Sequence, residues 1–500
     1  MDFKRILKPQ YYLLAILFLL VLGFRLFMVF QTPNFNYDAY FTLRQVENIK
    51  QTGLPLYEDP LSYGGKSQLF APLNYYILAV FSFIFPLDMV GKILPNIFAS
   101  LIVVLAYFFT LKSVKDPKVS LIIAFMAGFV PILFFDINNI TVNYLAILLI
   151  FAIIYCMTRI NEKKYTDYSL ILMFLLVLTT PLAFLLIIGF LFYLIYLKLE
   201  NQEIEIKEIE IILFFVFLTF WINLLIYKKA FATHGLLIIW QNAPLKFLSN
   251  LFSQLTFIEA FYTISIIPLI LGVYSIYHAF QNQQNKSVML LTGFLTGTFI
   301  LVWFKLLDLV TGLVFLSVTL VILSAFSMKG FVSFIEKTRI SKYENLIIGV
   351  LLVLFVVSAI IPSYLMIKNR IHQVPSSQDI NVFIAASQIT PKNAMIAATV
   401  EEGNLLAYYA NRKNIADINF LLTPNINQRV GDIDTIYKTR FETEGVGIMN
   451  NYGAKYLAVT SYAQAKYGIT EPFYVSDTAC FTLLYRSNQS KIYELKCKKR

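Results

Sequence analysis

Apolar segments alternate with short polar loops along the first three quarters of the chain. A helix needs about 20 apolar residues to cross a bilayer. The pattern predicts eleven membrane spans, near 11–30, 93–111, 119–135, 143–158, 168–180, 182–197, 209–227, 261–278, 288–304, 306–325 and 345–363. A further apolar stretch, 75–87, is too short to cross, so we predict that it lies in the membrane surface as an amphipathic helix.

The charged residues of the loops predict the orientation of the spans. With residues 75–87 in the membrane surface, most loop lysines and arginines fall on one face, which the positive-inside rule assigns to the cytoplasm. We therefore predict a multi-pass protein of the cell (plasma) membrane, with a cytoplasmic N-terminus and an outer C-terminus. Residues 31–92 then form the first outer loop.

The pattern changes after Pro362, and residues 364–500 contain no further span. Shorter apolar runs predict strands at 393–400 and 454–461, and helices at 404–412 and 430–450. The predicted fold class is a polytopic α-helical membrane protein with a C-terminal extracytoplasmic α/β domain. Residues 1–363 form the membrane domain and 364–500 the outer domain.

Two of the three cysteines, Cys480 and Cys497, lie on predicted strands that flank the turn SNQS. If Arg486 pairs with Lys491 across this turn, the register places the two cysteines opposite each other. A disulfide is then a hypothesis, which would suit an oxidising exterior. Free thiols are the alternative.

Composition agrees with a membrane protein and excludes a soluble enzyme. Hydrophobic residues make up 58% of the chain, 14% of residues are charged, and the mean hydropathy is +0.66. The net charge of +11 could indicate nucleic acid. The cations stand at the ends of apolar segments, however, as orientation signals do, so no nucleic-acid partner is predicted. Fingerprints of nucleotide-binding loops, serine hydrolases and zinc-binding helices do not occur.

The first outer loop contains the strongest candidate for chemistry, Asp38. Aspartate is a favoured N-cap, and a helix is predicted over 39–51, ending before Gly53. Its place eight residues after the first span also suits an acid or base that acts on a lipid-borne substrate. Glu58 and Asp59 add acid to the same loop, with solvated turn residues as the alternative.

Several stretches resemble the GT-C superfamily of membrane glycosyltransferases, and oligosaccharyltransferase catalytic subunits in particular. The first-loop segment YDAYFTLR, which begins at Tyr37, and the run at 57–66 are similar to first-loop motifs of that family. The resemblance continues through 94–131 and the second outer loop, FDINNITVNYLAI, and returns at 411–420. In layout it extends over most of the chain.

This resemblance implies transfer of a sugar or oligosaccharide from a polyprenyl phosphate or diphosphate to an acceptor protein, lipid or glycan. Asp38 would be the general base, and Asp38 with Asp136 would hold Mg²⁺ or Mn²⁺. Lys305 aligns with a basic residue that contacts the donor phosphate in the family, with an ion pair to Asp308 as the alternative. Arg25 would assist it or else snorkel to the membrane surface. Other residues assigned to substrate binding are Arg44, Glu58, Asp59, Asn143 and Arg412.

The chain also departs from the family pattern. By spacing, the second acidic motif falls on Asn143 and Leu145, while Asp136 is displaced by about two helical turns. The WWDYG motif that reads the acceptor peptide is absent, and the equivalent region reads EEGNLLAYY, 401–409. Transfer to Asn-x-Ser/Thr peptides is therefore an alternative to the main prediction. A non-catalytic transporter of lipid or polysaccharide is an alternative of another class.

Overall fold

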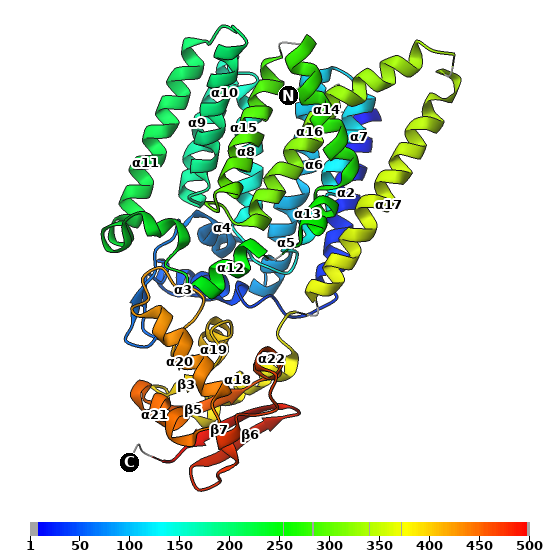
Figure 1. Ribbon diagram of the computed structural model, residues 1–500. Helices are drawn as coiled ribbons and strands as arrows, with labels where there is room; N and C mark the ends of the chain where they lie inside the picture. The colour runs from blue at the N-terminus through cyan, green and yellow to red at the C-terminus, as the bar shows by residue number, and fades with distance from the viewer. Residues whose placement is uncertain (1–8, 254, 283–284, 340, 372, 498–500) are drawn as a thin grey trace.

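The computed structural model describes residues 9–253, 255–282, 285–339, 341–371 and 373–497. A bundle of helices stands on a smaller unit built around a sheet (Figure 1). Between the two lies a long loop that follows the first helix of the bundle. In chain order, this part contains α2 (Pro9–Val29), α3 (Ala39–Thr52), β1 (Glu58–Asp59), β2 (Lys66–Ser67) and α4 (Leu73–Ser82).

All eleven segments predicted as spans are largely helical. The remaining bundle elements are α5 (Leu87–Ser100), α6 (Ile102–Val114), α7 (Pro117–Gly128), η1 (Pro131–Phe134), α8 (Asn143–Met157), α9 (Lys163–Thr179), α10 (Ala183–Leu199), α11 (Ile206–His234), η2 (Gly235–Trp240), α12 (Leu245–Ser253), α13 (Phe257–Ile264), α14 (Ile266–Asn282), α15 (Lys286–Trp303), α16 (Leu309–Glu336), η3 (Ser341–Tyr343) and α17 (Glu344–Ile371). Among the described residues, six helices are long and apolar enough to cross a membrane, and a seventh candidate is the pair α13–α14, bent by 79°. Other apolar helices are shorter, so the number of crossings stays a prediction.

The helix α4 agrees with the predicted surface segment. It has 10 residues, fewer than a bilayer crossing needs, and it lies beside α3 at the end of the bundle nearest the sheet unit (Figure 1). Val80 and Phe81 of α4, with Phe83 and Ile84 just after it, expose their apolar side chains. Such a helix can rest in the membrane surface and support the loop that precedes it.

Small residues allow the closest approach within the bundle. The sequence GFLTG places Gly293 and Gly297 one turn apart on α15, where they pack against Gly189 of α10. A Cβ atom at Gly293 would lie 2.6 Å from the backbone nitrogen of Tyr193, so no larger side chain fits. Close packing of small residues is a main source of helix association in membranes.

The C-terminal unit has a five-stranded sheet in the order β4-β3-β5-β7-β6. The strands β4, β3 and β5 are parallel to one another, while β7 and β6 add an antiparallel hairpin. Buried apolar side chains form a separate core on each face of the sheet. The elements of this unit are α18 (Ser377–Ile389), β3 (Met395–Ala397), α19 (Gly403–Tyr409), β4 (Lys413–Asn414), α20 (Ile426–Lys438), α21 (Glu442–Tyr452), β5 (Ala454–Val459), α22 (Ser461–Tyr467), η4 (Phe473–Ser476), β6 (Phe481–Ser487) and β7 (Ser490–Leu495).

The predicted register and disulfide are both confirmed. Arg486 lies opposite Lys491 across the β6–β7 turn, and Cys480 is bonded to Cys497, with Cα atoms 4.9 Å apart. The remaining cysteine, Cys156, is buried in α8. A disulfide that joins residues 17 apart ties the end of β7 back to the start of β6.

We expect the substitution Cys480→Ser to lower the free energy of unfolding of this unit by about 3 kcal/mol, because it frees a closed loop in the unfolded chain. Thermal denaturation in detergent, with and without a reductant, measures the effect. Reductant should lower the melting temperature of the wild type to that of the variant and leave the variant unchanged. Equal melting of the two oxidised proteins would contradict the prediction.

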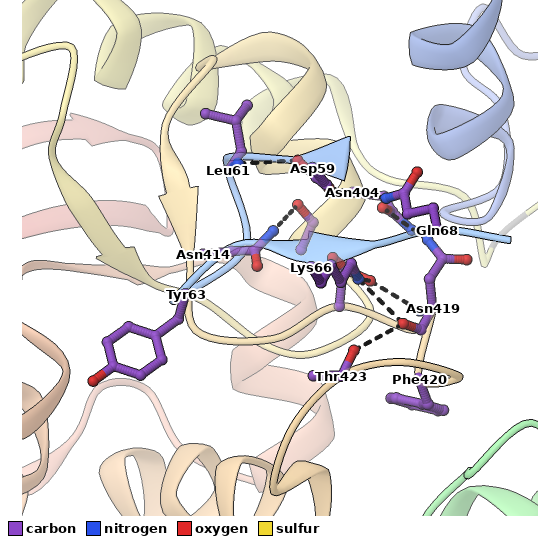
Figure 2. Close-up of polar contacts among 12 residues, drawn as sticks. Asp59, Leu61, Tyr63, Lys66, Gln68, Asn404, Asn414, Asn419, Phe420 and Thr423 are labelled. Atoms are coloured by element: carbon purple, nitrogen blue, oxygen red, sulfur yellow. Dashed lines mark hydrogen bonds and ion pairs between the residues drawn. The ribbon is translucent and has the colours of Figure 1, made fainter. Parts of the chain in front are cut away.

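The first loop is fastened to the C-terminal unit by buried polar contacts. The Lys66 ammonium lies 2.5 Å from an Asp417 carboxylate oxygen and donates to the Asn419 carbonyl oxygen at 3.1 Å. Figure 2 shows Lys66 on its strand, pointing at the segment that holds Asn419 and Thr423. The Asn414 backbone N–H donates to the Leu61 carbonyl oxygen at 2.8 Å. The loop therefore forms one packed structure with the sheet unit.

Candidate active site

Asp38 stands at the start of α3, at the end of the bundle nearest the sheet unit. The helix begins at Ala39 and ends as predicted before Gly53, whose φ of 80° suits glycine. Asp38 occupies the N-cap position, but its side chain makes no capping hydrogen bond. The residue is exposed, yet desolvation by the surrounding protein, with a smaller effect of Glu401, raises the pKa of its carboxyl. The carboxylate is therefore open to solvent, although protein around it disfavours its charged form.

The second loop brings Asp136 to the same place. Asp136 follows η1, and desolvation raises its pKa to about 7, with further increases from the Asp38 and Asp308 carboxylates and an opposing effect of Arg370. Two backbone-directed hydrogen bonds hold the loops together: the Asn36 N–H donates to the Asn138 carbonyl oxygen and the Thr42 hydroxyl to the Ile140 carbonyl oxygen. The fold thus brings acids from two loops and a helix end within electrostatic reach of one another.

Arg370 is the cation of this group, and the sequence did not single it out. It lies near the end of α17, with its guanidinium carbon 3.5 Å from the centre of the Phe135 ring. One of its nitrogens donates to the Gln373 side chain at 2.9 Å. A guanidinium placed over an aromatic ring can still direct N–H donors to a phosphate. Its place at the end of the last apolar segment was the only signal in the sequence.

The residues around Asp38 fit a divalent cation. Mg²⁺ and Mn²⁺ prefer carboxylate and amide oxygens. Two asparagines add amide oxygens to Asp38 and Asp136. The buried side-chain oxygen and nitrogen of Asn138, and the side-chain oxygen of Asn36, have no hydrogen-bond partner among the described residues. In the described part of the chain, no three carboxylates of this group have oxygens all within 4.8 Å of one another.

Four residues predicted to bind substrate make contacts inside the protein. Arg44 and Asp59 form a two-point ion pair at 2.6 and 2.9 Å, and Asp59 is fully buried, so neither is free for a substrate, nor is Asp59 a solvated turn residue. Arg412 gives five hydrogen bonds to oxygens of the sheet unit, among them that of Thr390, so its guanidinium is fully used inside the fold. Glu58 is exposed and accepts a hydrogen bond from Ser67.

Two of the remaining predicted residues differ in their access to a ligand. Arg25 neither snorkels nor reaches a surface: it is 1% exposed, donates to Asn96 and to the Leu133 carbonyl oxygen, and fixes the bundle interior. Lys305 is exposed, with its ammonium 5.8 Å from the centre of the Phe252 ring. The alternative for Lys305, an ion pair with Asp308, is not among the ion pairs of the described residues.

Asn143 links the second loop to the carboxylate at the start of α16. Its side-chain nitrogen donates to the Thr311 hydroxyl at 3.1 Å, and the Thr311 backbone N–H donates to Asp308 at 2.9 Å. Asp308 is therefore the N-cap of α16. Asn143 is therefore linked to Asp308 through Thr311, and its side-chain nitrogen already has a protein partner.

The sheet unit adds the buried acid Glu402. Desolvation raises its pKa from an ordinary 4.5 to about 8, while hydrogen bonds from Thr460 and Thr399 act in the opposite direction. Between these two pH values the folded protein keeps a proton that the unfolded chain releases. Stability from this group is therefore complete below about pH 4.5 and decreases as the pH rises toward about 8.

The substitution Glu402→Gln is expected to flatten this dependence, because glutamine imitates the protonated acid at every pH. The free energy of unfolding of the variant should rise relative to that of the wild type by about 1.4 kcal/mol for each pH unit inside the window. Thermal denaturation in detergent at about pH 5 and about pH 8 measures it. The control is Glu494→Gln, at a partly exposed glutamate of the same sheet. Parallel pH profiles of wild type and Glu402→Gln would refute the expectation.

Membrane helices, a long first loop with a free acid, a second acidic loop and a C-terminal sheet unit make up a fold that solved oligosaccharyltransferase structures share. The apo oligosaccharyltransferase of Archaeoglobus fulgidus superposes with a TM-score of 0.68 at 15% identity, over 96% of this chain and 73% of that chain. Its complex with an inhibitory peptide and a dolichol-phosphate gives 0.64 at 15%, over 88% and 69%. A further structure of that enzyme is a complex with Zn and sulfate.

A second kind of protein shares the same fold. ArnT from Cupriavidus metallidurans, bound to undecaprenyl phosphate, superposes with a TM-score of 0.57 at 11% identity, over 96% of this chain and 97% of that chain. No protein-family model matches the sequence, and the curated protein sequences give no match. The predicted fold class is therefore confirmed, while sequence identities this low show the fold alone.

Proposed function

We propose that the protein is a membrane glycosyltransferase that moves a sugar or oligosaccharide from a polyprenyl phosphate or diphosphate to an acceptor. The observation that carries this proposal is the free carboxylate of Asp38, which is exposed at the end of the membrane bundle and makes no capping hydrogen bond. Solved proteins of the same fold have dolichol-phosphate or undecaprenyl phosphate bound, which supports a lipid-linked donor.

With such a donor, the protein needs mainly to position the two substrates and to stabilise charge. The lipid phosphate is already a good leaving group, so the protein must align donor with acceptor and stabilise the negative charge that develops. Asp38 would accept the proton of the acceptor, and its raised pKa makes it a stronger base than an ordinary aspartate. Arg370, held on the Phe135 ring, would hold the phosphate together with Lys305.

A divalent cation would neutralise donor phosphate and acid at once. Asp38 and Asp136 would hold it, with the Asn138 amide oxygen as a third hard ligand. When bound, the cation supplies electrostatic stabilisation of the leaving phosphate. Without it, the neighbouring carboxylates would repel an anionic donor. The complex of the Archaeoglobus enzyme with Zn agrees with such a site.

The orientation of the chain is part of the proposal. We propose that the first loop and the sheet unit face the outside, because the loop cations favour a cytoplasmic opposite face. The Cys480–Cys497 disulfide supports this, since disulfides persist in oxidising compartments. The membrane part would then comprise residues 1–363 and the outer domain 364–500.

The direct test is incubation of membranes that contain the protein with radiolabelled polyprenyl-linked sugars and candidate acceptors, with and without a chelator. Transfer of label to an acceptor only when the protein is present supports the proposal. Loss of transfer with chelator, and its recovery with Mg²⁺ or Mn²⁺, would identify the cation. A transporter without catalysis would move the labelled lipid and leave the sugar on it.

Arg370→Lys is expected to raise the KM for the lipid-linked donor about tenfold, because an ammonium cannot make the two-point contact of a guanidinium. Arg370→Ala should have a larger effect on the same constant. The KM for the acceptor should stay the same in both variants. The matched control is Arg440→Lys, an exposed arginine of the sheet unit. An unchanged donor KM in Arg370→Ala would remove Arg370 from the phosphate site.

A further inference from the structure

Two tyrosine rings from distant parts of the chain meet beside Asp38. Tyr37 precedes Asp38 in the first loop, Tyr462 belongs to α22, and their ring centroids are 4.8 Å apart. Both residues are partly exposed. The Asp38 carboxylate contributes to the raised pKa of Tyr462, after desolvation and the larger effects of Glu401 and Glu402, so it lies within electrostatic reach of that ring.

The groups around these rings are mixed in charge: the Asp379 carboxylate acts on Tyr37 and the Asp38 carboxylate on Tyr462, while Glu401 and Glu402 add little net charge. The Glu401 carboxylate acts electrostatically on Tyr462 and pairs with Lys466 at 2.6 Å, so the two charges of this pair cancel. Glu402 acts electrostatically on both tyrosines, and its raised pKa of about 8 keeps it protonated at neutral pH. One of its oxygens is buried without a partner among the described residues. The surface thus offers two partly exposed aromatic rings, a phenol hydroxyl and carboxylate oxygens.

The neighbouring segment is used for packing. All residues from Gly403 to Ala407 are buried in α19, and Tyr408 and Tyr409 place their rings 5.7 and 5.5 Å from that of Tyr40 on α3. The Tyr408 hydroxyl also donates to Glu47 of α3 at 2.9 Å. Residues 403–407 therefore have no exposed side chains that could bind an extended peptide.

We infer that the surface formed by Tyr37, Tyr462 and Glu401 is an acceptor subsite for a sugar ring, and that the nucleophile is a sugar hydroxyl. The inference rests on the proposed function. Aromatic faces with a few polar groups suit a ring that has apolar C–H faces and a rim of hydroxyls. A hydroxyl oxygen has a free lone pair and needs only one base, whereas the lone pair of an amide nitrogen is delocalised into the carbonyl.

The step balances without a further reactant. The acceptor hydroxyl oxygen forms a bond to the anomeric carbon of the donor as the bond between that carbon and the phosphate oxygen breaks. The hydroxyl proton goes to the Asp38 carboxylate, and the bonding electrons leave with the polyprenyl phosphate or diphosphate. The products are a glycoside and the free lipid phosphate.

The test uses the full-length protein in detergent with a radiolabelled polyprenyl-linked sugar and three acceptors: a soluble oligosaccharide, a glycosylated lipid and an Asn-x-Ser peptide. We expect label on one of the two sugar acceptors, which also tells a glycan from a glycolipid. Tyr462→Ala should raise the KM for that acceptor about tenfold with the donor KM unchanged, and Tyr462→Phe should restore it. The control is Tyr343→Ala, at an exposed tyrosine directly before α17.

Each other result has a distinct meaning. Label on the peptide alone would overturn the inference and leave the proposed function in place. Label on a sugar acceptor with no change in its KM in Tyr462→Ala would overturn the subsite. Absence of transfer to all three acceptors, with no cleavage of the donor, would overturn the proposed function and the inference together.

Discussion

Replacing Asp38 by asparagine is expected to lower sugar transfer by about 10²- to 10⁴-fold, the contribution of a positioned general base. Asparagine has nearly the same shape but cannot accept a proton at neutral pH. The aspartate side chain makes no capping hydrogen bond to α3, so its replacement removes no contact that holds the helix. The measurement is the initial rate of label transfer by purified protein, at donor and acceptor concentrations above both KM values.

A second acidic residue of the same region provides the control for this variant. Asp88 is an exposed aspartate in the first turn of α5, close in sequence to the first loop. Asp88→Asn should transfer sugar at the wild-type rate, and both variants should melt at the wild-type temperature. Wild-type turnover by Asp38→Asn would exclude Asp38 as the base and would favour a non-catalytic role for the protein.

Features that depend on local pattern could be predicted from the sequence. The helix α3 ends at Gly53 because a left-handed residue stops it, and the eleven bundle segments follow from runs of apolar residues. The disulfide follows from a tight turn, since Arg486 opposite Lys491 fixes the register of both strands. In each case the residues that predict the feature lie within or directly beside the element that they form.

Partners that are distant in sequence could not be predicted. Arg44 and Asp59 looked like substrate ligands, but the fold turns the loop so that each neutralises the other. Arg370 lies more than two hundred residues from Asp136, and no pattern in either segment indicates that they meet. A charged residue in a sequence indicates that its charge needs a partner in the folded protein, but it does not show which group that partner is. Ligand and ion-pair roles are therefore confused most often at buried, mixed-charge sites.

The substitution Lys66→Met is expected to lower the free energy of unfolding by about 3–5 kcal/mol, because it leaves Asp417 buried without its counter-ion. Both side chains are 1% exposed, and the second oxygen of Asp417 has no partner among the described residues. Thermal denaturation in detergent measures the effect. Transfer should decrease as well, since Lys66 fastens the loop that carries Asp38 to the sheet unit, as Figure 2 shows for its contact with Asn419.

The double variant Lys66→Met/Asp417→Asn separates the cost of an unpaired charge from the value of the pair itself. Asparagine can still accept from the Asn419 backbone N–H, which donates to Asp417 at 2.9 Å. The double variant should therefore regain most of the stability that Lys66→Met loses. Lys246→Met, which breaks a largely exposed pair with Asp434, should cost less than about 1 kcal/mol. If Lys66→Met costs no more than Lys246→Met, the buried pair does not hold the loop, and the position of Asp38 must depend on the apolar contacts of α3 instead.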